Sequence, residues 1–369
     1  MIPGDKMFEA LKSEETIVLA CNTRITKGVL NGIFRAAKEM DAAVIFELAK
    51  SESDLSGGYT GLTPQEYAKR VKASAKKIGH DVWLLHADHI TVKNGTPEEI
   101  DDIKKLIMAQ IDSGYTSFAI DASYLFNLSG KSVSEELAEN IRVTTELARF
   151  IQQNMEESFG LEVEVGEIGR KSDSGLVLTT PEEAVTFIKG LARNGIEPNL
   201  LAIANGSSHG NTYDSEGNLI EQASIDIEQT IAVGKALEDA GFDVRIAQHG
   251  ITGTPVRIIK EEFPKRYIRK GNVGTHWQNI VWEILEKEEP VLFRNIWDWT
   301  LAKYSKPGKK DIEVFGKNSK QAIKVFFREI DTMKSSTERL IEQRAYEDAK
   351  IFFDAFNAVG TAQKVRGAI

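Results

Sequence analysis

The chain has 369 residues, of which 41% are hydrophobic and 27% charged, and its formal net charge is -9. This composition is typical of a folded protein with a sizeable core and argues against disorder. The net negative charge disfavours nucleic acid and anionic membranes as partners. Cys21 is the only cysteine, which excludes an intrachain disulfide. Neither a signal-peptide pattern nor a membrane-length apolar run is present, so we expect a cytoplasmic protein.

Short apolar, β-branched runs alternate along the chain with segments of helical length and periodicity. We predict strands at 16–22, 42–49, 81–89, 117–123, 161–169, 200–206, 244–250 and 267–274. One intervening segment, TTPEEAVTFIKGLARNG, carries its own boundary signals, with Thr180 as N-cap before Pro181 and Gly195 after the last turn. Eight such units predict an α/β fold, the (β/α)8 TIM barrel.

The pattern becomes entirely helical towards the C-terminus. We therefore expect two parts: a catalytic barrel at 1–300 and a helical extension at 301–369. The extension repeats apolar residues at helical spacing and should pack on the barrel or on a neighbouring subunit. A homodimer or homotetramer is the expected assembly.

Polar residues gather where the predicted strands end, which is where barrel enzymes hold their active sites. The third strand ends in LLHADHI, with His86, Asp88 and His89. Together with His209 and His249 after two later strands, His89 could supply three imidazole nitrogens to a divalent ion. Zinc suits such a set, and cobalt or iron could also be accommodated.

The neighbours of these histidines have more than one interpretation. Glu164 could orient a ligand or contact the metal directly. For His86 we favour a supporting role over ligation. Asp88 could orient a neighbour, although we favour a general acid/base beside a metal-polarised carbonyl. In an extended strand its side chain points away from that of His89, so the local bend decides whether both reach one cavity.

Glycine-bearing turns follow the last three strands, in ANGSSHGN, HGITGTP and KGNVGT. Their backbone N–H groups could approach a phosphate closely, and the loops after strands seven and eight are the usual phosphate site of such barrels. The candidate residues in these turns are Gly210, Gly250, Thr252, Gly253 and Thr275. A metal, an acid/base and a phosphate site together favour carbon–carbon bond cleavage, but they also fit a metal-dependent hydrolase or isomerase.

The sequence resembles the class II, zinc-dependent fructose-bisphosphate aldolases and related ketose-bisphosphate aldolases. The motifs that carry the resemblance are HADH (86–89), IDAS (120–123), EVEVG (162–166), SSHG (207–210), HGITGTP (249–255) and KGNVGT (270–275), in family order over about 15–290. The resemblance implies a reversible cleavage of a ketose 1,6-bisphosphate into dihydroxyacetone phosphate and an aldehyde.

The resemblance also implies roles for particular residues. It makes His89, His209 and His249 the zinc ligands and gives Glu164 an alternative or second metal position. Asp88 becomes the acid/base at the cleaved bond. Gly210, Gly250, Thr252 and Thr275 fall at phosphate-binding positions, and Asn272 at a position that contacts substrate near the metal. A monovalent cation is a further cofactor that the resemblance allows.

Three stretches depart from the family pattern. The loop GEIGRKSDSG has Lys171 and Ser172 where the family commonly has an acid, for which Glu167 or Asp173 might substitute. The loop NTYDSEGN lacks a common Tyr-Lys pair, and Gly274 replaces a common acidic residue. We therefore predict an aldolase for a phosphorylated ketose, with fructose 1,6-bisphosphate first and tagatose 1,6-bisphosphate as an alternative. A metal-dependent hydrolase and a non-catalytic sugar-phosphate binding protein are the competing hypotheses.

Overall fold

The computed structural model describes residues 1–369 except 167–170, 173–174, 209, 215 and 223. Its centre is a closed, parallel, eight-stranded barrel in which β1 pairs with both β2 and β12. The barrel strands are β1 (Val18–Asn22), β2 (Val44–Ala49), β3 (Trp83–Thr91), β4 (Ser117–Asp121), β5 (Gly160–Glu164), β8 (Leu200–Ala202), β11 (Arg245–Gln248) and β12 (Ile268–Val273). Each strand lies within one of the eight predicted runs or extends it by at most two residues.

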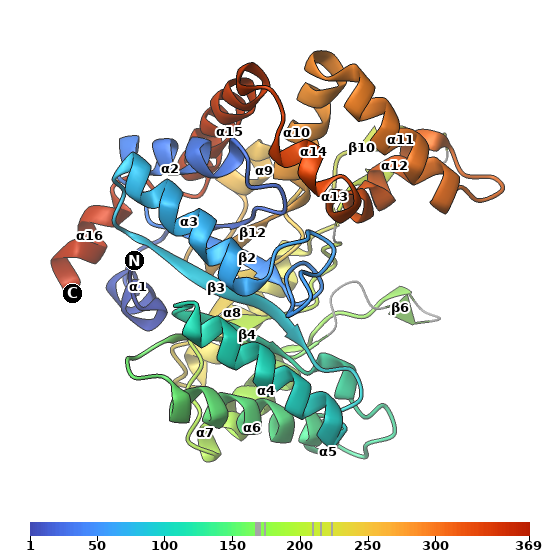
Figure 1. Ribbon diagram of the computed structural model, residues 1–369. Helices are drawn as coiled ribbons and strands as arrows, with labels where there is room; N and C mark the ends of the chain where they lie inside the picture. The colour runs from blue at the N-terminus through green and yellow to red at the C-terminus, as the bar shows by residue number, and fades with distance from the viewer. Residues whose placement is uncertain (167–170, 173–174, 209, 215, 223) are drawn as a thin grey trace.

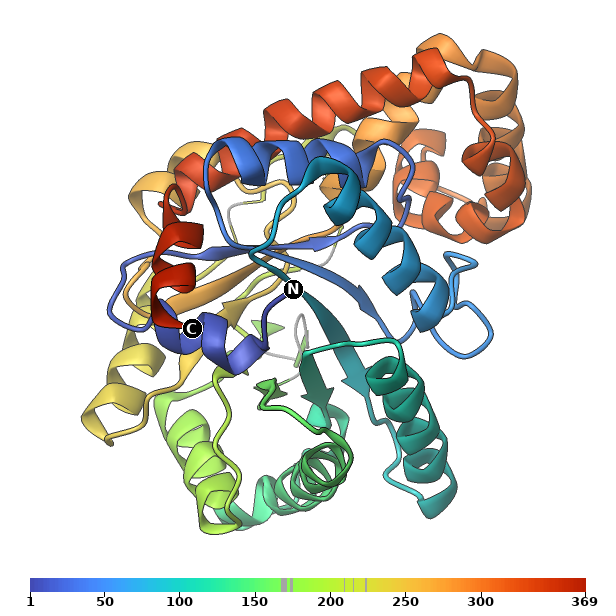
Figure 2. The same ribbon diagram turned by 60° about the vertical axis from the view of Figure 1, so that its left-hand side comes forward.

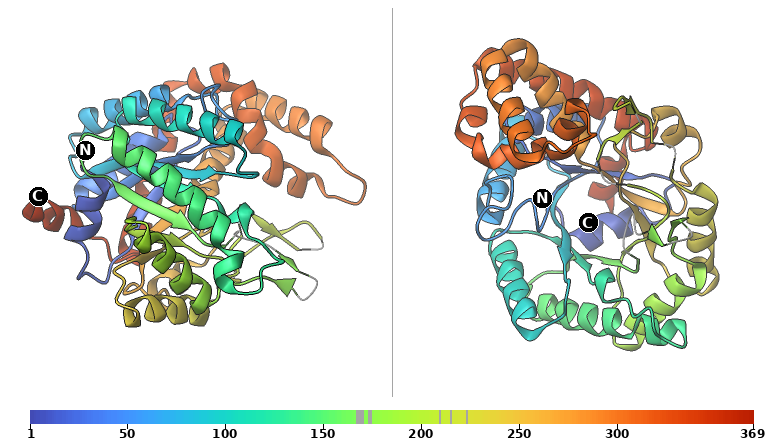
Figure 3. Two further views of the ribbon diagram at one scale, coloured as in Figure 1. Left: turned by 90° about the horizontal axis from the view of Figure 1, so that it is seen from below. Right: turned by 90° about the vertical axis from the view of Figure 1, so that its right-hand side faces the viewer.

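A ring of helices surrounds the strands (Figure 3). These helices are α2 (Val29–Glu39), α3 (Pro64–Ile78), α4 (Pro97–Asp112), α6 (Ala138–Asn154), α7 (Pro181–Arg193), α8 (Ile227–Asp239), α9 (Val256–Glu261) and α10 (Thr275–Glu288). The predicted signals of α7 are present: the Thr180 side chain accepts from Glu183 N and Gly195 has φ 76°. The (β/α)8 barrel expected from the sequence is confirmed.

The loops between the barrel strands and helices contain several short elements. They are η1 (Ser123–Leu125), α5 (Val133–Glu136), and the antiparallel pairs β6 (Lys171–Ser172) with β7 (Gly175–Leu176) and β9 (Thr212–Tyr213) with β10 (Leu219–Ile220). None of the described helices has the length and apolar character needed to cross a bilayer.

The side chains inside the barrel are apolar at its N-terminal end and polar at its C-terminal end. At the N-terminal end, α1 (Gly4–Ala10) closes the barrel, with Met7 and Phe8 packed against interior residues such as Ile45 and Leu84. Further along, the same strands point fully buried polar side chains inward, among them Glu47. The apolar end gives the barrel its inner core, and the polar end faces the loops that follow the strands.

The C-terminal helices are α11 (Pro290–Tyr304), α12 (Asp311–Asn318), η2 (Ser319–Gln321), α13 (Ala322–Val325), α14 (Phe327–Asp331), α15 (Ser335–Ala355) and α16 (Thr361–Ala368). Of these, α11–α14 form a second cluster beside the barrel, from which α15 runs back to α16 next to α1 (Figure 1). The predicted boundary at residue 300 falls within α11.

The long helix α15 runs along α2 (Figure 2). The close approach depends on Gly32, where a Cβ would lie 2.4 Å from the backbone oxygen of Glu342. Arg35 of α2 and Glu342 of α15 also form an ion pair of 3.0 Å. The C-terminal segment is thus packed on its own barrel.

Candidate active site

A cavity of about 300 Å³ opens at the C-terminal ends of the barrel strands. Its lining comes from both the barrel and the C-terminal helices: Asn22, Arg24, Ala49, Ser51, Glu52, Tyr59, Asp88, His89, Thr91, Asp121, Tyr124, Glu164, Gly210, His249, Gly250, Thr252, Asn272, Gly274, Thr275 and Lys320. Most residues that the sequence nominated therefore meet in one place.

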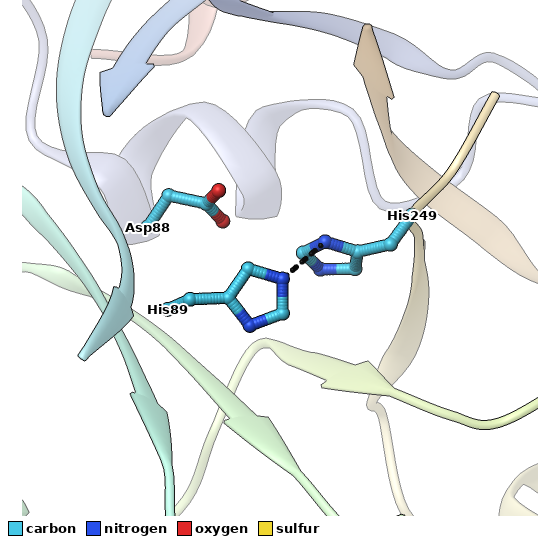
Figure 4. Close-up of side chains that lie close together, drawn as sticks. All are labelled: Asp88, His89 and His249. Carbon is cyan, nitrogen blue, oxygen red and sulfur yellow. Dashed lines mark hydrogen bonds between the residues drawn. The ribbon is translucent and has the colours of Figure 1, made fainter. Parts of the chain in front are cut away.

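Asp88 and His89 both reach this cavity because β3 is irregular at its end. His89 has φ 38°, and the β3–β4 register shifts between Ala87 and Ile90. A bulge of this kind re-aims side chains that a regular strand would send to opposite faces. Figure 4 shows Asp88 and His89 side by side, with His249 facing His89.

The two imidazoles approach each other closely, with His89 Nε2 2.9 Å from His249 Nδ1. Their other nitrogens face carboxylates: His89 Nδ1 lies 3.0 Å from Glu164 Oε2, and His249 Nε2 lies 2.8 Å from Glu162 Oε1. A carboxylate accepts a hydrogen bond from the ring N–H that faces it, which leaves a lone pair on each of the two facing nitrogens when both rings are neutral. Two lone pairs at this distance need a cation or a shared proton between them.

When no metal is bound, the local charges favour a proton between His89 Nε2 and His249 Nδ1. Burial opposes the charged form of His89, but the charges of Asp88 and Glu164 raise its pKa well above the usual value. Burial and the charge of His89 lower the pKa of His249. Burial and the nearby Asp121 raise the pKa of Glu164 to about 8. The raised pKa of His89 and the lowered pKa of His249 thus favour a proton on His89 that is donated to His249.

The same geometry suits a metal ion. Asp88, His89 and His249 offer ligand atoms within 4.8 Å of one another, and so do His89, Asp121 and Glu164. Imidazole nitrogens supported by buried carboxylates are the donors that zinc and related divalent ions use. The residues present therefore fit a divalent metal.

A buried ionic network lies beneath these groups. Lys270 Nζ is 2.7 Å from Glu162 Oε2, 2.9 Å from Glu47 Oε2 and 3.6 Å from Asp88 Oδ1. His86 joins the network, since its Nε2 lies 3.3 Å from Glu162 and its Nδ1 2.7 Å from Ser117 Oγ. His86 thus contacts the carboxylate that holds His249, in a supporting position.

Asp88 is held as an ionised hydrogen-bond acceptor. Its oxygens accept from Asn22 Nδ2 at 2.9 Å and from Asn272 Nδ2 at 3.3 Å. Burial opposes ionisation, but the charges of His89 and Lys270 keep the pKa of Asp88 well below its usual range. The carboxylate is fixed in direction and faces the cavity.

The glycine-bearing turns lie on another side of the cavity. Gly210, Gly250, Thr252 and Thr275 line it, whereas Gly253 lines a neighbouring hollow and its carbonyl accepts from Gln222 N. Thr275 is also the first residue of α10, whose dipole favours an anion at this end.

Three predicted residues, Glu167, Asp173 and His209, lie outside the described residues. Lys171 and Ser172, which occupy the expected region of the loop acid, form β6.

Sequence analysis gave no role to several residues around the site. Glu162 and Lys270 could have been found, because each is two residues from a nominated residue on its strand, Glu164 or Asn272, and so shares its face. Arg24 and Glu52 had no such signal, since they follow the first two strands in loops that carry no recognised motif.

The barrel and its buried cluster define an enzyme of the (β/α)8 class with a candidate metal centre at the usual end. The model of the family "Fructose-bisphosphate aldolase class-II" matches residues 3–342. The chain therefore belongs to the class II fructose-bisphosphate aldolase family, whose members are carbon–carbon lyases that use a divalent metal.

Solved structures show the same fold at low identity. The YdjI aldolase from Escherichia coli K12 is 19% identical, with 98% of this chain and 100% of that chain covered and a TM-score of 0.62. The fructose-bisphosphate aldolase from Campylobacter jejuni is 18% identical, with coverages of 97% and 95% and a TM-score of 0.63. A putative fructose-1,6-biphosphate aldolase from Coccidioides immitis is 18% identical, with coverages of 98% and 98% and a TM-score of 0.57.

Proposed function

We propose that the protein reversibly cleaves a phosphorylated ketose to dihydroxyacetone phosphate and an aldehyde, with fructose 1,6-bisphosphate as the first candidate and glyceraldehyde 3-phosphate as its aldehyde product. Tagatose 1,6-bisphosphate is the next candidate. The observation that carries the proposal is the cluster of Asp88, His89 and His249, whose ligand atoms lie close enough together to hold a divalent ion beside an ionised Asp88.

His89 and His249 would hold the metal, with His209 as the third ligand that the family resemblance implies and Glu164 as an alternative contact. Zinc is the proposed ion. When bound, a divalent ion here would polarise the ketone carbonyl of the substrate. Glu162 keeps the His249 ring in the tautomer that presents Nδ1 to the ion.

Asp88 is the proposed acid/base. In the cleavage direction it accepts the proton of the hydroxyl at the bond that breaks, and in the condensation direction it returns that proton. The amides of Asn22 and Asn272 hold its oxygens in place without supplying a proton of their own. Gly210, Gly250, Thr252 and Thr275 would hold the phosphate of the ketone half, and Asn272 the part of that half nearest the metal.

The test is a product assay on zinc-loaded protein against a panel of ketose mono- and bisphosphates, with triose phosphate as the readout. We expect cleavage of at least one bisphosphate, and loss of cleavage with a chelator. Cleavage that is indifferent to chelation would contradict the metal mechanism. Hydrolysis of the panel to inorganic phosphate without triose phosphate would favour a hydrolase, and saturable binding without turnover a sugar-phosphate binding protein.

Asp88→Asn tests the acid/base. The variant keeps the shape of the side chain but cannot accept the proton, so we expect turnover to fall by about 100-fold or more with zinc content unchanged. Asp102→Asn, on the exposed face of α4, is the matched control and should cleave normally. Normal turnover of Asp88→Asn would remove Asp88 from the mechanism.

A further inference from the structure

Glu52 anchors an arginine in the wall of the active-site cavity. The Glu52 carboxylate accepts from Arg24 Nε at 2.6 Å, Tyr59 Oη at 2.7 Å, Ala49 N at 3.0 Å and Asn22 Nδ2 at 3.2 Å. Four donors on one buried carboxylate leave it little freedom to turn. Because Glu52 takes the Nε edge of the guanidinium, the two terminal nitrogens of Arg24 are directed elsewhere.

Those terminal nitrogens point to the start of α10. Arg24 Nη1 donates to Thr275 Oγ1 at 3.1 Å and to Gln278 Oε1 at 3.4 Å. The Thr275 hydroxyl therefore acts as an acceptor towards Arg24, so its own proton is available to a different acceptor. Thr275 lines the cavity at a helix N-terminus, where that acceptor would be an anion.

Gly274 makes room for the guanidinium. A Cβ at Gly274 would lie 3.1 Å from Arg24 Nη2 and 3.3 Å from Asn22 Cβ. The backbone at Gly274 has φ -119°, so its conformation does not itself require glycine. The missing side chain leaves space for the terminal nitrogens of Arg24 next to Thr275.

A second cation borders the same space. Lys320, in the η2 turn of the C-terminal helices, lines the cavity, and its Nζ lies 5.6 Å from the centre of the Tyr59 ring. Burial and the positive charge of Arg24 both lower the pKa of Lys320. Arg24 and Lys320 thus repel each other across this wall of the cavity, and Glu52 is paired with Arg24. A doubly charged anion bound between the two cations would relieve the repulsion.

We propose that Arg24 binds the phosphate of the ketone half of the substrate together with Thr275, and that it selects phosphorylated ketoses. Glu52 takes Nε, and Thr275 and Gln278 take Nη1, so Nη2 is the guanidinium nitrogen that would donate charge-assisted hydrogen bonds to the phosphate, in the space that Gly274 leaves. The identity of the substrate in this inference rests on the proposed function. The assignment of Arg24 to the substrate phosphate rests on the geometry around Arg24.

The test uses inorganic phosphate as the probe, with calorimetric binding to zinc-loaded protein. Arg24→Met removes the charge-assisted hydrogen bonds, so we expect the dissociation constant for phosphate to rise by about 10- to 100-fold. Arg24→Lys keeps the charge but loses the Nη2 donor and should recover only part of the affinity. Gly274→Ala keeps Arg24 but crowds its terminal nitrogens, and should also weaken binding. Arg142→Met, on the exposed face of α6, is the matched control.

Kinetics on the cleaved ketose bisphosphate add a second readout. Arg24→Met should raise KM by a similar factor with zinc content unchanged. Its urea unfolding midpoint should fall, because the buried Glu52 carboxylate loses its cation, whereas Arg24→Lys should keep most of the stability. Phosphate binding by Arg24→Met equal to that of the unmodified protein would overturn the inference, and so would absence of phosphate binding by the unmodified protein at millimolar concentration. Phosphate binding that depends on Arg24 but without cleavage of any ketose would overturn the proposed function instead.

Discussion

Lys270 offers a quantitative test of the network beneath the active site. Its side chain is fully buried, and its Nζ lies 2.7 Å from Glu162 and 2.9 Å from Glu47. Burial and the charge of Asp88 raise the pKa of Glu47 well above its usual value, so Glu162 is the principal ionised partner. Lys270→Met therefore leaves a buried carboxylate without its cation, and we expect the free energy of unfolding to fall by about 3–5 kcal/mol.

The loss of unfolding free energy in Lys270→Met should depend on pH, and the titration of Glu162 decides its direction. In the unmodified protein burial opposes ionisation, but Lys270 and His249 hold the pKa of Glu162 well below its usual value. Its contribution to stability is therefore present above the unfolded-state pKa and is lost as the pH falls through the folded-state pKa. Without Lys270, burial should raise the folded-state pKa of Glu162 instead. The deficit of Lys270→Met should then grow as the pH rises from about 5 to 8.

Urea unfolding at both pH values measures this deficit. Lys235→Met is the matched control, because Lys235 pairs with Asp239 on an exposed helix face, and its stability should change little. Combining Lys270→Met with Glu162→Gln should recover part of the loss, since the second change removes the unpaired charge. A deficit below about 1 kcal/mol for Lys270→Met, independent of pH, would refute the reasoning that this pair balances charge inside the barrel.

Three further predictions follow from the metal site, the C-terminal helices and a helix cap. Zinc at about 100 times its dissociation constant should stabilise the protein by about 2.7 kcal/mol, and His249→Ala should lose this response in thermal unfolding. Gly32→Leu places a side chain against the α15 backbone, so limited proteolysis should cleave the C-terminal helices sooner, and equal protection would contradict the proposed docking. Thr180→Ala removes the α7 cap and should cost about 1 kcal/mol in urea unfolding, whereas Thr180→Ser should be near neutral.

The barrel and several of the residues that line its cavity could be predicted from the sequence because their signals are local. β-branched runs with helical segments between them gave eight strands, and capping residues gave the start of α7. The strand ends nominated Asp88, His89 and His249, since parallel strands in a barrel deliver their C-terminal ends to one face.

Other parts of the site were decided only by the tertiary structure. The left-handed backbone of His89 turns it and Asp88 into one cavity, although strand alternation alone separates them. The contact of Lys270 with Glu162 joins strands that are far apart in the sequence and forms only when the barrel closes.

The position of Arg24 was also decided only by the tertiary structure. It depends on a carboxylate 28 residues away and a hydroxyl 251 residues away. The sequence by itself determined which strands and strand ends this protein has, because hydrophobic periodicity and capping act between near neighbours. Which charges meet inside the barrel was decided by its closure, since only a closed sheet brings the inward side chains of those strands within hydrogen-bond distance.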